Sequence, residues 1–259
     1  MKRLFFAFVK PVCLFFLFMF FGCRNGKIEI DSAADLENKI IGCQAETTGE
    51  FFLINNFDSV KIQPFRDGNE ACLALKNKEI DAVILDEFPA HVLVKNNRDL
   101  KIVDLNLAPE EYAIAVRKGD SKLLDSVNAT IRKMKTAGIF EMLQNSFMPP
   151  DGNIIIPEIS SGNHEKSIKM GTNAAFPPFE YTNGTNVVGF DISFAKYIAN
   201  DLDRNLQVFD MSFPSLFDAL EAGSIDFICA GLTETEGRKE YVDFSDPYFT
   251  TKQVVIVRK

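Results

Sequence analysis

Residues 171–181 read GTNAAFPPFEY, residues 189–202 read GFDISFAKYIANDL, and residues 212–249 read SFPSLFDALEAGSIDFICAGLTETEGRKEYVDFSDPYF. Apolar runs suited to strands alternate here with apolar residues at helical spacing, and small or polar residues follow the runs. In an open α/β sheet, the strand ends form the crevice in which ligands bind. These three pieces therefore predict an α/β sheet with a ligand site at the ends of its strands.

Individual elements of this stretch can be placed from local chemistry. Apolar residues recur at nearly helical spacing over residues 190–202, which predicts a helix. Pro214 and Gly223 bracket a second predicted helix, because proline is favoured near a helix start and glycine beyond its end. Residues 225–230 form a short apolar run, which predicts a buried strand.

Four motifs give the stretch a specific resemblance: NAAFPPFEY, GFD, IDFICAGLTxTxxR and DFSDPYF, in this order along residues 173–249. Together they resemble the first lobe of the periplasmic solute-binding proteins that deliver polar amino acids to ABC transporters. The resemblance implies a two-lobed periplasmic-binding-protein fold (type II-like), an α/β architecture in which each lobe is a βαβ sheet sandwich.

The earlier part of the chain resembles the second lobe of the same family. Residues 35–50 read DLENKIIGCQAETTGE and residues 80–86 read IDAVILD, and YAIAVRK at residues 112–118 matches the closing segment of the family. The family's second lobe therefore precedes its first lobe, so we interpret the chain as a circular permutant. Permutation is tolerated where the original termini lie close together.

This interpretation divides the chain into six segments. The expected domains are a signal peptide (1–22), a lipidated tether (23–29), the second ligand-binding lobe (30–111), a hinge strand with the closing helices of the first lobe (112–148), a permutation linker (149–166), and the core of the first lobe ending in a hinge strand (167–259). We expect only the crossing near residues 112–116 to stay covalently intact, with the terminal strand packed beside it.

The first 22 residues are excluded from the fold. Lys2, Arg3 and Lys10 are followed by an apolar core at residues 14–21, which is typical of a secretory signal peptide. A small residue then precedes Cys23, which resembles a lipoprotein processing site. We expect lipid on Cys23 and a location on the periplasmic or cell-surface side of a bacterial membrane. An ordinary signal peptide or an uncleaved anchor is the alternative.

Composition bounds the remaining possibilities. The net charge of −8 disfavours a nucleic-acid partner. Cys43, Cys72 and Cys229 lack the paired spacing of a disulfide framework and are expected to be small buried side chains. The two histidines, His91 and His164, lie far apart in the sequence, with no cysteine or carboxylate at the spacing of metal ligands. No metal or other cofactor is expected, and we expect a monomer.

The resemblance carries over to nine candidate ligand-binding residues. It implies that Arg238 pairs with the α-carboxylate of an amino acid, helped by the Thr233 hydroxyl and by backbone N–H groups of Gly231 and Thr48. Asp86 would bind the α-ammonium, with a helix cap as its alternative role. The rest are the rings expected to sandwich the ligand side chain and the amides expected to bind its far end: Phe176, Phe213, Asn173 and Gln44.

Departures from the family pattern bear on the ligand. Asn173 replaces a frequent acidic residue, and no additional lysine or arginine stands at the side-chain positions. Two amides facing one side chain favour a neutral, hydrogen-bonding group such as that of glutamine. Arginine and histidine remain alternatives, because Glu46 or Glu180 could supply negative charge.

The resemblance implies a non-enzymatic receptor that captures a free polar L-amino acid by lobe closure and delivers it to an ABC transporter permease. An enzyme of the same fold, such as a dehydratase, is the second hypothesis. It would need an acid or base in the cleft, and Glu46 is the one carboxylate outside the family pattern. An amino-acid sensor that acts through a signalling partner is the third.

Overall fold

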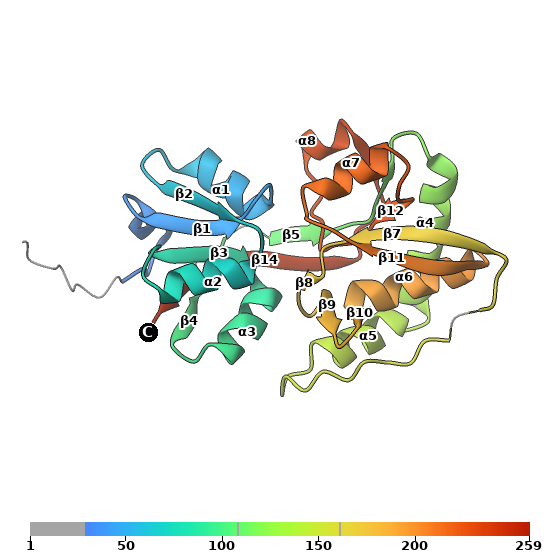
Figure 1. Ribbon diagram of the computed structural model, residues 1–259, viewed down its shortest axis with the longest axis horizontal. Coiled ribbons are helices and arrows are strands. Elements are labelled where there is room, and N and C mark those ends of the chain that lie inside the picture. Colours follow the sequence, from blue (N-terminus) through green and yellow to red (C-terminus); the bar gives the residue numbers. More distant parts are fainter. Residues whose placement is uncertain (1–28, 108, 161) are drawn as a thin grey trace, which may run out of the picture.

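The computed structural model describes residues 29–107, 109–160 and 162–259. They form two α/β lobes joined by two strands (Figure 1). The N-terminal part comprises η1 (Ala33–Leu36), β1 (Ile40–Gln44), α1 (Thr48–Asn56), β2 (Lys61–Phe65), α2 (Gly68–Lys76), β3 (Ala82–Asp86), α3 (Glu87–Asn96), β4 (Leu100–Val103) and β5 (Pro109–Tyr112).

The remaining elements are β6 (Ala115–Arg117), α4 (Ser121–Thr136), α5 (Ile139–Phe147), β7 (Lys166–Thr172), β8 (Ala175–Phe176), β9 (Glu180–Asn183), β10 (Asn186–Val188), α6 (Phe190–Asp201), β11 (Arg204–Asp210), α7 (Ser215–Glu221), β12 (Phe227–Ile228), α8 (Glu236–Lys239), β13 (Val242–Phe244) and β14 (Phe249–Arg258). The helices expected at residues 190–202 and after Pro214 are present. The strand expected over residues 225–230 is shorter, because only Phe227 and Ile228 pair with neighbouring strands.

The sheet of the N-terminal lobe has the order β2-β1-β3-β14-β4. Strand alternation sends successive side chains to opposite faces. In β3, Val83 and Leu85 pack with α2 and α3, while Ala82 and Ile84 pack with α1 and η1. Both faces of β3 are therefore buried against helices, which explains why its apolar residues follow one another without interruption.

The sheet of the C-terminal lobe has the order β11-β7-β12-β6-β13. Helix α7 packs on one face through Leu216 and Leu220, and helices α4, α5 and α6 cover the other face. The parallel strands β7 and β12 end at Thr172 and Ile228, so the loops that follow them lie at one edge of the sheet. This edge faces the N-terminal lobe (Figure 1).

The final strand, β14, belongs to both lobes. Its first half pairs with β5 in antiparallel register, Phe249 opposite Tyr112. Its second half lies between β3 and β4, with Val255 opposite both Ile84 and Val103. The expected packing of the terminal strand beside Tyr112 is confirmed. The expectation of only one covalent crossing is wrong, because the apolar residues 254–257 continue into the sheet of the N-terminal lobe.

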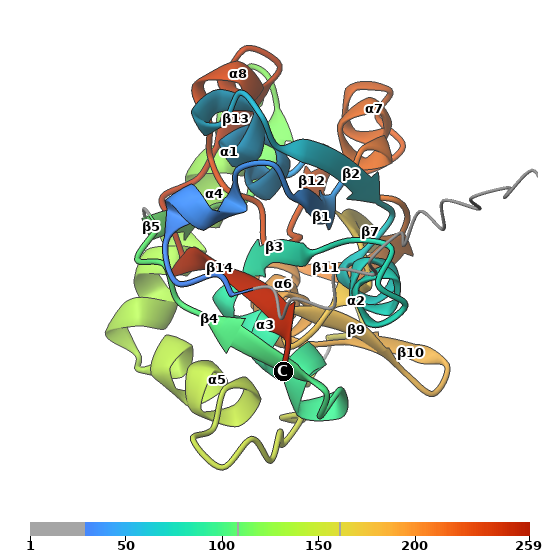
Figure 2. The ribbon, with the colours of Figure 1, turned by 90° about the vertical axis from the view of Figure 1, so that its left-hand side faces the viewer.

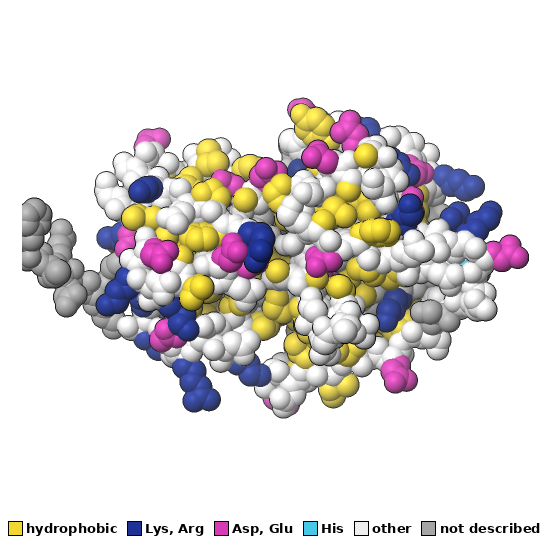
Figure 3. Space-filling model, in the orientation of Figure 1, with side chains coloured by type: hydrophobic (Ala, Val, Ile, Leu, Met, Phe, Trp, Pro, Cys, Tyr) yellow, Lys and Arg dark blue, Asp and Glu magenta, His cyan; other side chains and the backbone are white. Residues whose placement is uncertain are grey.

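The C-terminus ends at the outer end of the N-terminal lobe, beside the place where the described chain begins (Figure 2). Ile30 and Val257 are buried in one apolar cluster, and the Lys259 N–H donates to the Asp99 carbonyl. Residues 148–160 and 162–165, between α5 and β7, are irregular apart from a turn. No helix within the described ranges has the length and apolar character that crossing a membrane requires. Acidic and basic side chains are interspersed over the face shown in Figure 3.

Candidate functional site

The loops between the lobes enclose one polar cavity, and all nine predicted ligand-binding residues line it. The cavity measures about 20 Å³, which is room for roughly one water molecule. The lining residues are Gln44, Thr47, Thr48, Ile84, Leu85, Asp86, Asn173, Phe176, Glu180, Phe213, Ala230, Gly231, Thr233, Arg238 and Gln253. The lobes are therefore closed on each other, and an amino acid can enter only after they separate.

Arg238 lies in the short helix α8, which Thr235 caps through a bond from the Arg238 N–H. Its guanidinium donates to the Thr233 carbonyl at 2.7 Å and, across the cleft, to the Glu46 carbonyl at 2.9 Å. The guanidinium also lies over the Phe213 ring, 5.4 Å from its centroid. Burial lowers the pKa of Arg238 to about 10, and Glu110, Asp86 and Glu46 partly offset this shift. A buried, charged fork at the cavity wall is suited to binding a carboxylate.

Asp86 ends β3 and precedes α3, but its side chain makes no cap hydrogen bond to that helix. The carboxylate instead accepts a 2.6 Å hydrogen bond from the Tyr112 hydroxyl and a very short one from the Gln253 amide. Burial, and then the negative charge of Glu110, raise the pKa of Asp86 well above its usual value. An ammonium group beside Asp86 would relieve this unfavourable burial of negative charge.

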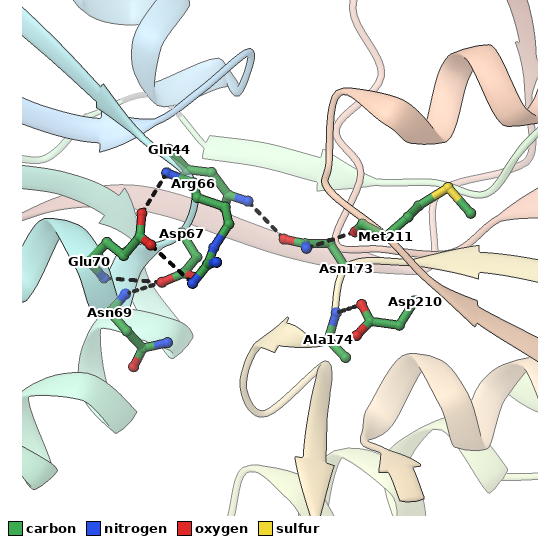
Figure 4. A network of polar contacts seen from close by, with 9 residues as sticks. All are labelled: Gln44, Arg66, Asp67, Asn69, Glu70, Asn173, Ala174, Asp210 and Met211. Carbon is green, nitrogen blue, oxygen red and sulfur yellow. Dashed lines mark hydrogen bonds and ion pairs between the residues drawn. The ribbon is translucent and has the colours of Figure 1, made fainter.

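The two predicted amides face each other from opposite lobes. Gln44 Nε2 donates to Asn173 Oδ1 at 2.9 Å, and Asn173 Nδ2 donates to the Met211 carbonyl at 2.9 Å (Figure 4). Ala174 is held in turn by Asp210, whose carboxylate accepts its N–H at 2.8 Å. The loop after β7 is thus fixed by side chains from β11, which positions Asn173 opposite the end of β1.

The two predicted aromatic residues line the cavity, and both are nearly buried. Phe176 stacks on Phe179, with ring centroids 5.9 Å apart. Gly231 lies against Phe176 with a φ of +53°, and a Cβ at Gly231 would come within 2.5 Å of the Phe176 ring. Glycine at this position therefore allows both the left-handed turn and the close approach of the ring.

Two of the expected ligand donors, the Gly231 N–H and the Thr233 hydroxyl, are bonded within the protein in this structure. The Gly231 N–H donates to Asp191 Oδ2 at 2.9 Å, so it does not point to a ligand carboxylate. The hydroxyls of Thr48 and Thr233 both donate to Glu110 Oε2, at 2.9 and 2.8 Å. These donors are used inside the protein because buried or half-buried carboxylates lie within their reach.

Glu110, Gln253 and Glu180 were not assigned to the site from sequence, although Glu180 was noted as a source of charge. Glu110 shares a strand face with Tyr112, which strand alternation could have indicated. Glu180 is fully buried, and neither of its carboxylate oxygens has a hydrogen-bond partner. Burial, and next the charge of Asp191, raise the pKa of Glu180 well above its usual value, which favours the neutral acid.

Glu46, the carboxylate outside the family pattern, lies at the edge of the cleft. Its backbone has a φ of +60°, a left-handed conformation that glycine adopts without cost. Its N–H donates to the Glu50 carboxylate at 2.6 Å, which stabilises the turn into α1. Glutamate in place of glycine therefore makes this left-handed turn less favourable in conformational free energy, but the turn still forms.

The cysteines are structural in the described part of the chain. Cys43, Cys72 and Cys229 are free and buried, as expected. Burial raises the pKa of each thiol, that of Cys43 to about 12. No group of His, Cys, Asp and Glu within these ranges is arranged to hold a metal ion. Cys23, the expected lipidation site, lies outside the described residues, as do the expected signal peptide and most of the tether.

Part of this chain is similar to proteins of a known family. Residues 168–259 match the family described as bacterial extracellular solute-binding proteins, family 3. The chain is 41 % identical over 99 residues to the arginine-binding extracellular protein ArtP of Bacillus subtilis, covering 38 % of this chain and 39 % of that protein. It is 38 % identical over 100 residues to a probable histidine-binding protein of Neisseria gonorrhoeae, covering 38 % and 37 %.

Among solved structures, the arginine-bound form of domain 1 from TmArgBP is 42 % identical, with a TM-score of 0.32. That match covers 36 % of this chain and 80 % of the domain. The chain spans about two-fifths of the length of the two relatives named above. Residues 168–259 of this chain are therefore similar to the bacterial extracellular solute-binding proteins, family 3.

Proposed function

We propose that this protein is a non-enzymatic receptor that captures a free polar amino acid between its two lobes for an ABC transporter. The observation that carries the proposal is the placement of Arg238 and Asp86 on the wall of one interlobe cavity. A guanidinium and a carboxylate on opposite lobes match the two charges of a zwitterionic amino acid. Named relatives include arginine- and histidine-binding proteins, which supports this class of ligand.

The identity of the amino acid is proposed more narrowly. Glutamine was expected from the amides of Gln44 and Asn173, and these two amides bond to each other across the cleft. One lone pair of Asn173 Oδ1, both lone pairs of Gln44 Oε1 and the second N–H of each amide remain available for a ligand. We therefore propose glutamine, arginine and histidine as the ligands to be tested first.

Capture would proceed by lobe closure. Strands β5 and β14 are the two connections between the lobes, and they pair side by side. Opening would break the bonds that Gln44 and the Glu46 carbonyl make with the other lobe. A ligand replaces these contacts with its own, so that closure becomes favourable in its presence.

We further propose that the chain is a circular permutant that acts as a lipid-anchored monomer with a transporter permease as partner. The adjacency of Ile30 and Val257 supports the permutation, since a short link could join the two ends. The anchor would be attached at Cys23. Incorporation of labelled fatty acid in a bacterial host tests it: the label should disappear in a Cys23→Ser variant, and its persistence there would contradict the anchor.

Thermal unfolding with each common amino acid tests the receptor function. A ligand that binds only the folded protein raises the Tm in a concentration-dependent way. We expect a shift with one or a few polar amino acids and none with leucine or alanine. Failure of every amino acid to raise the Tm would contradict the proposed function.

A further inference from the structure

Glu180 and Asp191 are two fully buried acids that the chain brings together in the C-terminal lobe. The Asp191 N–H donates to the Phe179 carbonyl at 2.9 Å, which fixes the start of α6 against the chain before β9. Gly189 permits this approach, because a Cβ at Gly189 would collide with the same carbonyl. Glu180 follows Phe179 directly and lines the interlobe cavity, so the acid pair borders the candidate site.

Hydrogen-bond donors are unequally distributed over the two acids. Asp191 Oδ2 accepts from the Tyr248 hydroxyl at 2.7 Å and from the Gly231 N–H at 2.9 Å. Among the described residues, no donor reaches Asp191 Oδ1 or either oxygen of Glu180 when both acids are ionised. A buried polar atom without a partner is costly, so three such oxygens on neighbouring side chains need an explanation.

A proton on one of the two acids supplies that explanation. Burial raises the pKa of both, and the charge of Asp191 and a hydrogen bond between the two carboxyl groups raise the pKa of Glu180 further. Ionised carboxylates only accept hydrogen bonds, so the bond between them exists only when one of them is protonated. Two buried carboxylates in contact also cannot both remain charged, since like charges repel strongly there.

The surroundings of Asp191 favour its ionised form, which leaves the proton on Glu180. Asp191 lies in the first turn of α6, where the positive end of the helix dipole stabilises a negative charge. It also accepts the two hydrogen bonds from Tyr248 and Gly231, whereas Glu180 accepts none among the described residues. A neutral Glu180 can donate its O–H to Asp191 Oδ1, which gives that oxygen its missing donor.

The other groups around Glu180 act in the same direction. Asp210 and Asp86 face it from the ends of β11 and β3, and their negative charges raise its pKa further. Arg238 lies on the same cavity wall, but the acids that counter its burial are different ones. The remaining titratable neighbours are uncharged at neutral pH, because burial raises the pKa of each: Tyr112, Cys229 and Tyr248.

The acid pair is joined to the ligand site through Gly231. This glycine lines the cavity with a φ of +53° and begins the loop that leads to Arg238. Asp191 holds its N–H, and the proton on Glu180 holds Asp191 in turn. Loss of that proton would place two negative charges in contact in a buried site, and their repulsion would displace the carboxylate that holds the turn.

We propose that Glu180 and Asp191 form a one-proton carboxyl pair that positions the Gly231 turn of the cavity wall. Glu180 donates the shared proton and Asp191 carries the charge. Glu180 thus acts through Asp191 and is a positioning residue, for which contact with a ligand is not required. The effect on amino-acid binding rests on the proposed function, whereas the shared proton does not.

Denaturant unfolding of the full chain, as processed by a bacterial host, tests the shared proton between about pH 5.5 and 7.5, above the usual carboxyl pKa. An acid that is protonated when folded and ionised when unfolded makes the unfolding constant rise about tenfold per pH unit. Glu180→Gln has no such proton, so its unfolding constant should rise about tenfold less per pH unit than that of the unchanged protein. Glu111→Gln removes an exposed carboxylate on β5 and should behave like the unchanged protein. The same pH dependence in Glu180→Gln and the unchanged protein would overturn the shared proton.

Calorimetric titration with the common amino acids tests the positioning role. Glu180→Gln keeps an N–H that can donate to Asp191, so its affinity should stay within about threefold of the unchanged protein. Glu180→Met removes the donor at similar size and should weaken binding by about tenfold or more. Unweakened binding in Glu180→Met, or equal weakening in both variants, would overturn the positioning role. If the unchanged protein binds no amino acid, the proposed function fails, and the unfolding experiment still decides the shared proton.

Infrared spectroscopy of the unchanged sequence keeps the proposal testable if the variants do not fold. A protonated carboxylic acid has a carbonyl stretching band that an ionised carboxylate lacks. This band should be present at about pH 7.5 and should shift when glutamate carries a heavy carbon isotope in its side-chain carboxyl group. The label separates Glu180 from Asp86, an aspartate whose pKa burial also raises. Absence of a label-sensitive band would overturn the proposal.

Discussion

Gln44 and Asn173 lie on opposite lobes and are joined by a 2.9 Å hydrogen bond, in which the Gln44 amide donates to the Asn173 carbonyl oxygen. The two residues are 129 positions apart in the sequence, and they meet only because the lobes close. The side chain of a bound amino acid would extend between them. Residue 173 is therefore a direct means of changing which side chain is accepted.

Asn173→Asp should shift the preference of the cleft towards cationic amino acids. A carboxylate can still accept the hydrogen bond from Gln44, while it adds negative charge to the cavity wall. We expect the affinity ratio of arginine to glutamine to rise by about tenfold, measured by calorimetric titration. The matched control is Asn183→Asp, on an exposed strand end outside the cavity. An equal rise in both variants would show that overall charge, and not position 173, is responsible.

Asp86→Asn should raise the unfolding temperature at neutral pH by a few degrees and remove amino-acid binding. Burial and Glu110 raise the pKa of Asp86 in the folded protein. The folded state then binds its proton more tightly than the unfolded state does. The protonated Asp86 therefore contributes its full stabilisation at pH values below the pKa it has in the unfolded state. This contribution is lost as the pH rises through the higher pKa that Asp86 has in the folded state.

Thermal unfolding between about pH 4 and 8, a range that begins near the ordinary carboxyl pKa and extends above it, measures this effect. The decline in Tm with rising pH should be shallower in Asp86→Asn than in the unchanged protein, and Glu111→Gln should behave like the latter. A lower Tm with intact binding in Asp86→Asn would contradict the role assigned to this carboxylate.

Ile256→Ala should destabilise the N-terminal lobe, although only three residues follow Ile256 in the sequence. Its side chain is fully buried on β14, opposite Val83 and Ile102 of the neighbouring strands. Removing such a side chain from a core costs about 2 to 5 kcal/mol in the free energy of unfolding. Denaturant unfolding measures it, with the exposed Thr250 on the same strand as the control in Thr250→Ala. Equal, small losses in both variants would show that β14 is not part of this core.

Restoring the family's order of lobes tests the proposed permutation. A chain that begins near Asn163, continues to Lys259 and is joined through about six Gly and Ser residues to Ile30 should fold and bind the same amino acids. Ile30 and Val257 are already in one apolar cluster, so the join spans a short distance. A folded product that binds with the same selectivity is expected. Failure to fold with linkers of several lengths would contradict the proposal.

Much of the site could be predicted from sequence because its residues lie at fixed distances from recognisable strand ends. Arg238 lies seven positions after Gly231, and Asp86 ends an apolar run. In both cases the sequence motif and the expected end of a strand indicate the same residue. Gly231 is required by a positive φ and by the Phe176 ring, which is the physical basis for its place in the motif. The alternative role of Asp86 as a helix cap is excluded by its bonds to Tyr112 and Gln253.

The rest depended on contacts between distant segments, which local patterns do not specify. Gln253 lines the cavity, and Glu110 accepts hydrogen bonds from the lining residues Thr48 and Thr233. Both positions depend on the pairing of β5 with β14, which joins residues far apart in the sequence. The second covalent crossing was missed for the same reason. Residues 254–257 are consecutive apolar residues, so side chains on both faces of this strand are apolar. That pattern could have indicated a central strand buried on both faces rather than an edge strand.

The central claim is that the cleft binds a polar amino acid through Arg238, and calorimetric titration with and without this side chain tests it most directly. We predict saturable binding of at least one of arginine, histidine and glutamine to the unchanged protein. In Arg238→Ala the affinity should fall by about a hundredfold or more, since the buried α-carboxylate of the ligand loses the cation that pairs with it. The adjacent Lys239→Ala should bind normally, because Lys239 pairs with Glu234 and Glu236 outside the cavity. Binding of the same amino acid to Arg238→Ala with an affinity within about threefold of the unchanged protein would contradict the account.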